Sequence, residues 1–284
     1  MTVTRIAVLG AGTMGHGIAH AAIAAGYDTR LFDVGESALA EGHAAVRAIV
    51  TKGLELGKIS PRDAEAVLAR LTTGTDLTSV LADADFIIEA APERMDLKLQ
   101  LFQEIERLAP REAIVTSNTS ALSITEMAAT LENPSRVAGM HFFNPVHKMK
   151  LVEIVKALET SPSTLAVVAE VASRMGKETV LVREAPGFIT TRINASIGNE
   201  AFYMLMEGIA SARDIDKALK LGLNHPMGPF ELVDLVGLDT RLSILEYLHR
   251  SMGEKYRPCP LLVQYVKAGR LGRKVGKGVY DYPR

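Results

Sequence analysis

The chain has 284 residues, about twice the roughly 150 residues of a typical domain, so we expect one large domain or two modest ones. It carries 32 Lys and Arg residues against 33 Asp and Glu residues, and this balance gives no overall basic field for nucleic acid or an anionic membrane. Hydrophobic residues make up 48% of the chain, enough for a core, but no apolar run reaches the roughly 18 residues of a membrane span.

Cysteine usage and the start of the chain bear on where the protein works. Cys259 is the single cysteine, which excludes an intrachain disulfide and a multi-cysteine metal site. Glycines interrupt the short apolar run at the start, and no small-residue cleavage site follows it. We therefore expect a cytoplasmic protein in a reducing compartment, without a bound metal.

The first half of the chain alternates short apolar runs with longer amphipathic stretches. Strands are predicted at Arg5–Gly10, Asp28–Asp33, Phe86–Ala90 and Ala113–Ser117. Helices are predicted at Thr13–Gly26, Glu36–Leu56 and Leu97–Leu108, with another beginning at Ser60-Pro61. This alternation predicts a parallel sheet covered by helices on both faces.

The second half changes character near Pro186. Before it, strands are predicted at Val137–Phe142, Leu151–Val155 and Thr179–Val182, with a helix at Thr164–Met175. After it we find little but helices, at Phe188–Glu207, Ala212–Lys220, Glu231–Val236, Asp239–Met252 and Leu261–Ala268. We therefore expect an α/β domain over residues 1–185 and a smaller all-helical domain over residues 186–284.

The first predicted strand runs directly into the motif G-A-G-T-M-G, with glycines at Gly10, Gly12 and Gly15. In this setting Gly10 permits a tight turn, Gly12 lets the backbone approach a pyrophosphate, and Gly15 allows close helix–strand packing. The following helix N-terminus, with Thr13 and Met14, supplies N–H donors for the phosphates. The pattern predicts a Rossmann-type dinucleotide-binding domain; the alternative is a tight turn that binds nothing.

Asp33, at the end of the second predicted strand, bears on the choice of cofactor. A carboxylate here accepts hydrogen bonds from the ribose hydroxyls and repels a 2′-phosphate, which favours NAD over NADP. The nearby Arg30 would instead favour NADP, but we interpret it as a solvated charge on an alternating strand.

A dehydrogenase acting on an alcohol needs a base for the hydroxyl proton and a group that orients this base. His141 ends a predicted strand at the edge where doubly wound sheets bind ligands, and Glu153 lies inside the apolar strand that follows. A carboxylate among apolar residues needs a partner, so the two side chains are expected to hydrogen-bond, as a catalytic pair or as a satisfied core pair. Packing, surface or loop roles are expected for the other histidines: His16, His20, His43, His147, His225 and His249.

The segment Ser117-Asn118-Thr119-Ser120 follows another predicted strand. Its hydroxyls and amide are candidates for binding a substrate oxygen. The alternative is a cluster of N-caps for a helix at Ile124–Ala129, which suits Ser120 and Ser123.

Taken together, these motifs resemble the L-3-hydroxyacyl-CoA dehydrogenase family, and within it the short bacterial 3-hydroxybutyryl-CoA dehydrogenases. The resemblance covers essentially the whole chain. Its markers are GAGTMG (10–15), IEAAPE (88–93), SNTS (117–120), HFFNPV (141–146), LVEIV (151–155), PGFI (186–189), NHPMGPFELVDLVGLD (224–239) and GRLGRKVGKGVYDY (269–282).

The resemblance implies an oxidoreductase of fatty acid and butanoate metabolism that interconverts (S)-3-hydroxybutyryl-CoA and acetoacetyl-CoA with NAD. His141 corresponds to the family's base and Glu153 to its orienting carboxylate, while Ser117 and Asn144 match positions near the substrate. The resemblance also implies cofactor contacts at Ala91, Glu93, Lys98, Ser117 and Asn118, and coenzyme A contacts at Lys52 and Lys58. The lysines are equally well interpreted as solvated helix residues.

One departure from the family pattern concerns the substrate. Many members have asparagine where this chain has Thr191, which keeps a hydroxyl but loses the amide donor. The acyl-chain preference is therefore open, and a longer or dicarboxylic 3-hydroxyacyl-CoA such as 3-hydroxyadipyl-CoA, or a free 3-hydroxy acid, is the alternative substrate. A non-catalytic, crystallin-type NADH-binding protein is the alternative of a different class. The resemblance also implies a homodimer formed by the helical domain.

Overall fold

The computed structural model describes residues 2–283, which form two compact units. One unit ends at Glu184 and the other begins at Ala185, beside the Pro186 at which the sequence changes character. Within residues 2–283, no helix is both long enough and apolar enough to cross a membrane.

The N-terminal unit is built around a sheet of eight strands among the described residues, in the order β3-β2-β1-β4-β5-β6-β7-β8. The strands are β1 (Arg5–Leu9), β2 (Asp28–Phe32), β3 (Leu71–Gly74), β4 (Phe86–Glu89), β5 (Ile114–Ser117), β6 (Val137–Phe142), β7 (Leu151–Lys156) and β8 (Glu178–Arg183). The helices are α1 (Thr13–Ala24), α2 (Glu36–Glu55), α3 (Pro61–Leu68), α4 (Leu77–Leu81), α5 (Met95–Leu108), α6 (Ile124–Ala128) and α7 (Pro162–Arg174).

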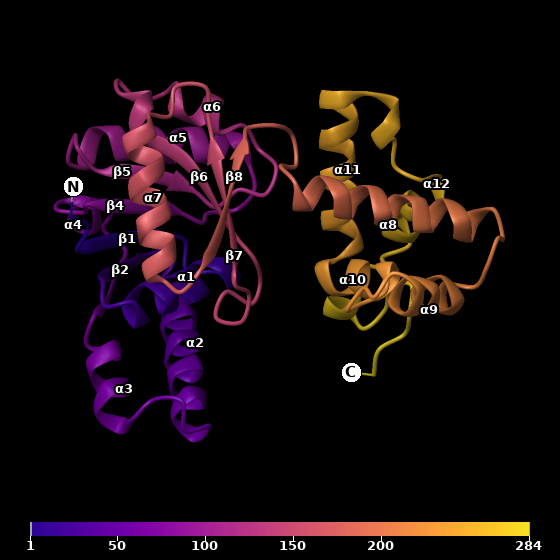
Figure 1. Ribbon diagram of the computed structural model, residues 1–284, viewed down its shortest axis with the longest axis horizontal. Helices are drawn as coiled ribbons and strands as arrows, with labels where there is room; N and C mark the ends of the chain where they lie inside the picture. Colours follow the sequence, from indigo (N-terminus) through magenta and orange to yellow (C-terminus); the bar gives the residue numbers. More distant parts are fainter. Residues whose placement is uncertain (1, 284) are drawn as a thin grey trace. The chain divides into compact units, whose positions relative to one another are not determined.

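Helices cover both faces of the sheet, as the alternating pattern predicts (Figure 1). On one face, α1 and α7 pack against a continuous apolar core that includes Ile18, Val8, Ile88, Met140 and Val171. On the other face, α6 packs on β6, where Ile124 approaches Gly139. Figure 1 also shows α2 and α3 projecting from the sheet as a helix pair.

The strands predicted in the first half of the chain pair in parallel, as expected, but the complete sheet also contains one antiparallel pair. β7 runs antiparallel to β6, while the other neighbouring strands pair in parallel. The reason is the short connection between them, residues 143–150, since a parallel return needs a crossover of a dozen or more residues. Two short elements were not predicted: β3, an edge strand, and α4, a five-residue helix capped by Asp76.

The C-terminal unit is helical, as predicted. Its helices are α8 (Thr190–Met206), α9 (Ala212–Gly222), α10 (Pro229–Val236), α11 (Leu238–Met252) and α12 (Pro260–Lys267). They enclose a separate core that includes Phe202, Phe230, Leu245 and the buried, free Cys259. Each unit thus has its own apolar interior.

Candidate active site

The carboxyl ends of neighbouring strands bring most of the predicted site residues to one edge of the sheet. β2, β1, β4, β5 and β6 lie side by side and run in parallel. Glu89 of β4 pairs with Ser117 of β5, which pairs in turn with Gly139, two residues before His141 in β6. Paired residues, and residues two apart in a strand, present their side chains on the same face. Glu89, Ser117 and His141 therefore share one face at the edge where such sheets bind ligands.

The loop between β1 and α1 has the geometry that its glycines were expected to permit. Gly10 has a φ of 108°, which side-chain-bearing residues rarely adopt. A Cβ atom on Gly15 would lie 1.7 Å from the carbonyl oxygen of Gly10, so only glycine lets the helix pack this closely. A Cβ on Gly12, the exposed N-cap of α1, would have no described atom within 4 Å. This open space beside the N–H groups of Thr13 and Met14 fits a pyrophosphate.

Asp33 follows β2, and the backbone holds its carboxylate beside this loop. Oδ2 accepts a hydrogen bond from the N–H of Ala11 at 2.9 Å, and Oδ1 accepts one from the N–H of Gly35 at 3.1 Å. The carboxylate is thus fixed where this fold binds the adenosine ribose of a dinucleotide.

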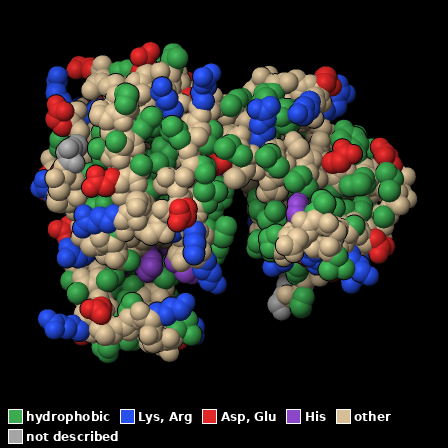
Figure 2. Space-filling model, in the orientation of Figure 1, with side chains coloured by type: hydrophobic (Ala, Val, Ile, Leu, Met, Phe, Trp, Pro, Cys, Tyr) green, Lys and Arg blue, Asp and Glu red, His purple; other side chains and the backbone are tan. Residues whose placement is uncertain are grey.

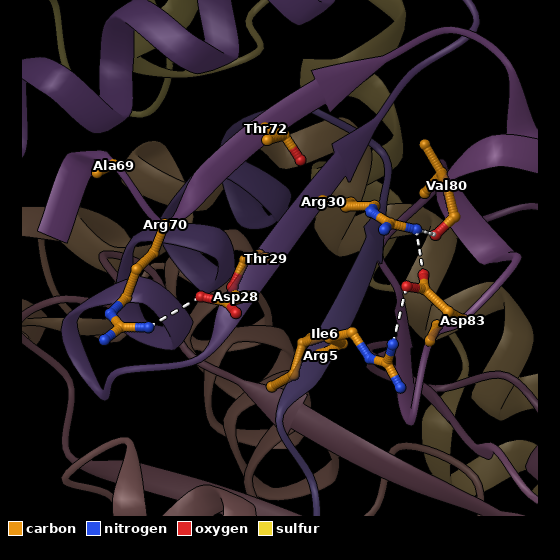
Figure 3. A pocket seen from close by; sticks show the side chains of 11 residues that line it. Arg5, Ile6, Asp28, Thr29, Arg30, Ala69, Arg70, Thr72, Val80 and Asp83 are labelled. Atoms are coloured by element: carbon orange, nitrogen blue, oxygen red, sulfur yellow. Dashed lines mark hydrogen bonds and ion pairs between the residues drawn. The ribbon is translucent and has the colours of Figure 1, made fainter.

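A cavity of about 340 Å³ opens at the opposite, amino edge of the sheet, and it is not the cofactor site. Figure 3 shows Arg5 and Arg30 facing Asp83 across this cavity, with Arg70 facing Asp28. The nitrogen–oxygen distances are 2.9 Å for Arg5–Asp83 and 2.8 Å for Arg70–Asp28. The interpretation of Arg30 as a solvated charge was therefore wrong: it is ion-paired and directed away from the edge that fits the dinucleotide.

His141 and Glu153 form a buried cross-strand pair. The antiparallel register of β6 and β7 places them directly opposite each other, and Nδ1 of His141 lies 2.7 Å from Oε2 of Glu153. His141 is 6% exposed and Glu153 is fully buried, with the ring of Phe143 at 4.6 Å from the imidazole. The hydrogen bond expected from the sequence is present. With the Nδ1–H donated to the carboxylate, the proton-accepting lone pair of the neutral ring is on Nε2.

Glu89 is a buried carboxylate at this edge that the sequence analysis did not select. It accepts hydrogen bonds from Ser117 Oγ at 2.5 Å, Lys98 Nζ at 2.6 Å and the Ala91 N–H at 2.7 Å. Lys98 is 1% exposed, so its ammonium lies behind this edge and positions Glu89 and Ala91. The signal was present in the sequence, because a carboxylate ending the apolar run FIIE needs a partner just as Glu153 does.

Glu93 organises the turn that follows β5. Its Oε1 accepts hydrogen bonds from Thr119 Oγ1 at 2.6 Å and from the N–H of Ser120 at 2.9 Å. Its Oε2 lies 3.6 Å from Nζ of Lys98. Glu93 therefore joins the segment after β5 to the buried charges behind it.

Of the two serines interpreted as possible N-caps, Ser120 and Ser123, only Ser123 caps a helix. Ser123 caps α6, and its side chain accepts a hydrogen bond from the N–H of Glu126. Ser120 binds Glu93 instead. Asn118 accepts a hydrogen bond from the N–H of Phe142 at 2.8 Å, and so fixes the end of β5 against the end of β6.

The remaining predicted residues are spread over other segments. Asn144 is exposed in the loop after β6, and Lys58 is exposed in the turn between α2 and α3. Lys52 forms an exposed ion pair with Glu55 at 2.8 Å, a contact of small energetic value. Thr191 lies in the first turn of α8 in the C-terminal unit and is half-buried.

Hydride transfer from an alcohol to a dinucleotide requires a binding site for the dinucleotide and a proton acceptor near its nicotinamide. One edge of this sheet supplies both. The open glycine loop fits the dinucleotide phosphates, and the carboxylate-oriented imidazole fits the acceptor. Fold and site thus define a dinucleotide-dependent dehydrogenase.

Comparisons with known proteins specify this class. A family model described as 3-hydroxyacyl-CoA dehydrogenase, NAD binding domain, matches residues 5–185, and one for the C-terminal domain matches residues 187–282. The chain belongs to the 3-hydroxyacyl-CoA dehydrogenase family. The predicted family, fold class and NAD cofactor are thereby confirmed, and the protein is an oxidoreductase.

Individual relatives cover the chain from end to end. It is 46% identical to a probable 3-hydroxybutyryl-CoA dehydrogenase of Bacillus subtilis over 99% of this chain and 98% of that protein. It is 40% identical to a 3-hydroxyadipyl-CoA dehydrogenase of Escherichia coli over 99% of this chain and 60% of that protein. The crystal structure of (S)-3-hydroxybutyryl-CoA dehydrogenase from Ralstonia eutropha matches with a TM-score of 0.96 at 40% identity, covering 100% of both chains.

Proposed function

We propose that this protein interconverts (S)-3-hydroxybutyryl-CoA and acetoacetyl-CoA, with NAD as the hydride carrier. The observation that carries the proposal is the buried hydrogen bond of 2.7 Å between His141 and Glu153 at the ligand-binding edge of the sheet. The names of relatives that align over their full length support the choice of substrate.

In the oxidation direction, Nε2 of His141 takes the proton of the substrate 3-hydroxyl as the C3–O bond becomes a carbonyl. Bound NAD supplies the acceptor for the hydride that leaves C3. The negative charge of Glu153 stabilises the imidazolium and holds the ring in the tautomer that accepts at Nε2. General base catalysis of this kind contributes roughly 10²–10⁴-fold to the rate. In reduction the same proton returns to the product oxygen.

The other predicted residues take supporting roles in this proposal. Gly10, Gly12 and Gly15, with Thr13 and Met14, hold the dinucleotide phosphates, and Asp33 holds the ribose. Ala91, Glu93, Lys98, Ser117 and Asn118 build the nicotinamide end of the site. On the substrate side we assign Ser117, Asn144 and Thr191 to the acyl group and Lys52 and Lys58 to coenzyme A. The proton of the Ser117 hydroxyl is directed at Glu89, so Ser117 contributes mainly by positioning.

We also propose that two copies of the chain associate through the helical unit, in the cytoplasm. Large apolar side chains on this unit are exposed, including Leu221 at 77%, Leu223 at 66% and Ile193 at 56%. Exposed apolar area of this kind is typical of a protein–protein interface. A second copy is the occupant that the resemblance implies.

Steady-state reduction of a series of 3-ketoacyl-CoA esters tests the function, with NADH and NADPH in parallel. We expect the highest kcat/KM for acetoacetyl-CoA with NADH. A higher value for 3-ketoadipyl-CoA would favour the dicarboxylic substrate, for which the similarity to the 3-hydroxyadipyl-CoA dehydrogenase is the supporting observation. Preference for a free 3-keto acid would contradict the coenzyme A assignment. Tight NADH binding without any turnover would contradict catalysis altogether.

A further inference from the structure

A cavity of about 880 Å³ lies within the helical unit, and none of its lining residues is assigned to the cofactor or the substrate. It is bounded by α9, the first turn of α10 and the C-terminal segment, and its volume suits a small molecule. Figure 2 shows blue lysine and arginine side chains on the side of this unit where Figure 1 labels α9. We define the basic rim as the four cations that line the cavity: Arg213, Lys217, Lys220 and Arg273.

The basic rim joins two segments that are far apart in the sequence. Lys217 follows Arg213 by four residues and Lys220 follows Lys217 by three, so the three side chains are neighbours on one face of α9. Arg273 reaches the same cavity from the 3₁₀ helix Arg273–Val275. Like charges at these spacings destabilise a helix, and an anion placed between them would relieve the repulsion.

Three carboxylates also line the cavity, but two of them are already bound by other groups. Asp216 is buried and accepts hydrogen bonds from two backbone N–H groups of α10, at 2.8 and 3.2 Å, and from the hydroxyl of Tyr280, at 2.7 Å. Glu231 accepts a hydrogen bond from the ammonium of Lys220 at 2.5 Å. The third carboxylate, Asp281, is exposed.

The other three cations of the basic rim have no carboxylate partner. In the part of the chain that the structure describes, residues 2–283, no salt bridge includes Arg213, Lys217 or Arg273. Only Asp281 opposes their charge across the cavity. Cations gathered in a concave site with few acidic neighbours create a positive potential that attracts an anion.

The wall opposite α9 is held in place by buried carboxylates. The hydroxyl of Tyr280 donates to Asp216, and that of Tyr282 donates to Asp234 at 2.9 Å. Asp234 also accepts hydrogen bonds from the N–H groups of Val279 and Tyr280, at 2.8 and 2.9 Å. Both tyrosine hydroxyls are therefore engaged inside the unit, and the C-terminal segment is fixed before any ligand arrives, which lowers the entropic cost of binding.

We propose that this cavity binds a small organic anion with two or more negative charges on phosphate or carboxylate groups. The guanidinium groups of Arg213 and Arg273 suit both kinds of group, because each presents paired N–H donors. Lys217 adds a point charge, and the tyrosine rings of the wall offer apolar contact to the body of the ligand. The site is additional to the positions of dinucleotide and substrate proposed above and does not depend on them.

Isothermal titration calorimetry of the full chain tests this site, with inorganic tripolyphosphate and citrate as the titrants. Saturating NADH and coenzyme A are present throughout, so that the phosphate positions of the proposed function are occupied. We expect at least one titrant to bind with one ligand per chain. Binding of tripolyphosphate alone assigns a phosphate ligand, binding of citrate alone assigns a carboxylate ligand, and binding of both shows that the site selects charge rather than one group.

The double variant Arg213→Gln and Lys217→Gln removes two cations of the basic rim and leaves the buried carboxylates in place. Because hydrogen bonds to charged groups are lost, we expect the dissociation constant to rise roughly ten- to hundred-fold. The matched control is Lys267→Gln, since Lys267 is an exposed cation on α12 that does not line the cavity, and the constant should stay unchanged. Thermal unfolding of each variant verifies that it is folded.

Four results would overturn the inference. The first is that neither titrant binds the wild type. The second is that the double variant keeps the affinity of the wild type. The third is an equal loss in Lys267→Gln, which would show a diffuse effect of net charge. The fourth is binding that appears only when coenzyme A is left out, which would place the anion in the substrate site instead.

Discussion

At the residue scale, His141 and Glu153 divide the proton chemistry between a base and the group that positions it. The imidazole is almost buried and the carboxylate is fully buried, so their 2.7 Å hydrogen bond acts in a low dielectric. In such surroundings the ring orientation is fixed, and a fixed orientation is what a general base needs.

The first prediction concerns His141→Gln. Glutamine retains a polar group that can bind Glu153 but accepts no proton, so we expect kcat to fall by roughly 10²–10⁴-fold. The affinity for NADH should stay unchanged, because the glycine loop lies on other strands. Steady-state kinetics and fluorescence titration of NADH measure the two quantities. Near-normal turnover would remove His141 from the mechanism.

The second prediction concerns Glu153→Gln, which keeps the size of the side chain and removes its charge. We expect a fall in kcat of roughly 10²-fold, because the imidazolium loses the charge that stabilises it. The rising limb of kcat for oxidation should also move to lower pH. If kcat falls while the pH profile keeps its position, Glu153 has a packing role only.

At the element scale, two segments govern the cofactor. The β1–α1 loop offers open space at Gly12, and the end of β2 offers the carboxylate of Asp33. Because backbone N–H groups hold this carboxylate, its position depends on the loop rather than on its own rotamer.

For Asp33→Ala we expect the ratio of kcat/KM with NADPH to kcat/KM with NADH to rise about ten-fold, since repulsion of the 2′-phosphate disappears. Asp28→Ala, at the first residue of β2 and paired with Arg70 at the amino edge, is the matched control and should leave the ratio unchanged. An unchanged ratio for Asp33→Ala would show that another group binds the ribose.

The buried charges behind β4, β5 and α5 support a stability prediction. Glu89→Gln leaves the ammonium of Lys98 without its closest carboxylate, so we expect the free energy of unfolding to fall by about 3 kcal/mol. Glu104→Gln, which breaks an exposed pair with Arg107, should cost less than about 1 kcal/mol. Urea denaturation of the two variants measures the difference, and equal losses would contradict the role of Glu89.

The sequence predicted those elements that have a strong local signal. The strand at Val137–Phe142 has the predicted bounds because its apolar run is continuous, and α3 begins after Ser60 because Ser60 and Pro61 form a cap. β3 was missed because Leu-Thr-Thr-Gly carries one buried residue and forms a strand only by pairing with β2. Its existence depends on tertiary contacts that local patterns do not encode.

The prediction of site residues was limited in the same way, because contacts between distant segments leave no local pattern in the sequence. The partner of Glu153 was predictable, since two strands next to each other in the chain supplied both residues. The partners of Glu89 come from α5 and β5, and no local spacing brings them together.

At the scale of the whole molecule, the proposed dimer yields the last prediction. We expect sedimentation equilibrium to give the mass of two chains for the wild type. The double variant Leu221→Glu and Leu223→Glu should shift this equilibrium towards the single chain, because it places charges on exposed apolar positions. A single-chain mass for the wild type would contradict the dimer, and an unaffected dimer in the variant would exclude this surface from the interface.

The antiparallel pairing of β6 and β7 also has a consequence for how such an enzyme changes over evolution. β6 is tied to β5 and β7 to β8, so residues 143–150 join two ends that the sheet already holds. Substitutions in this loop leave His141 opposite Glu153. The two strands of this hairpin thus carry the catalytic pair. In our proposal, the loop that joins them contributes residues that bind the ligand. Affinity can drift by mutation of the loop while the reaction is preserved.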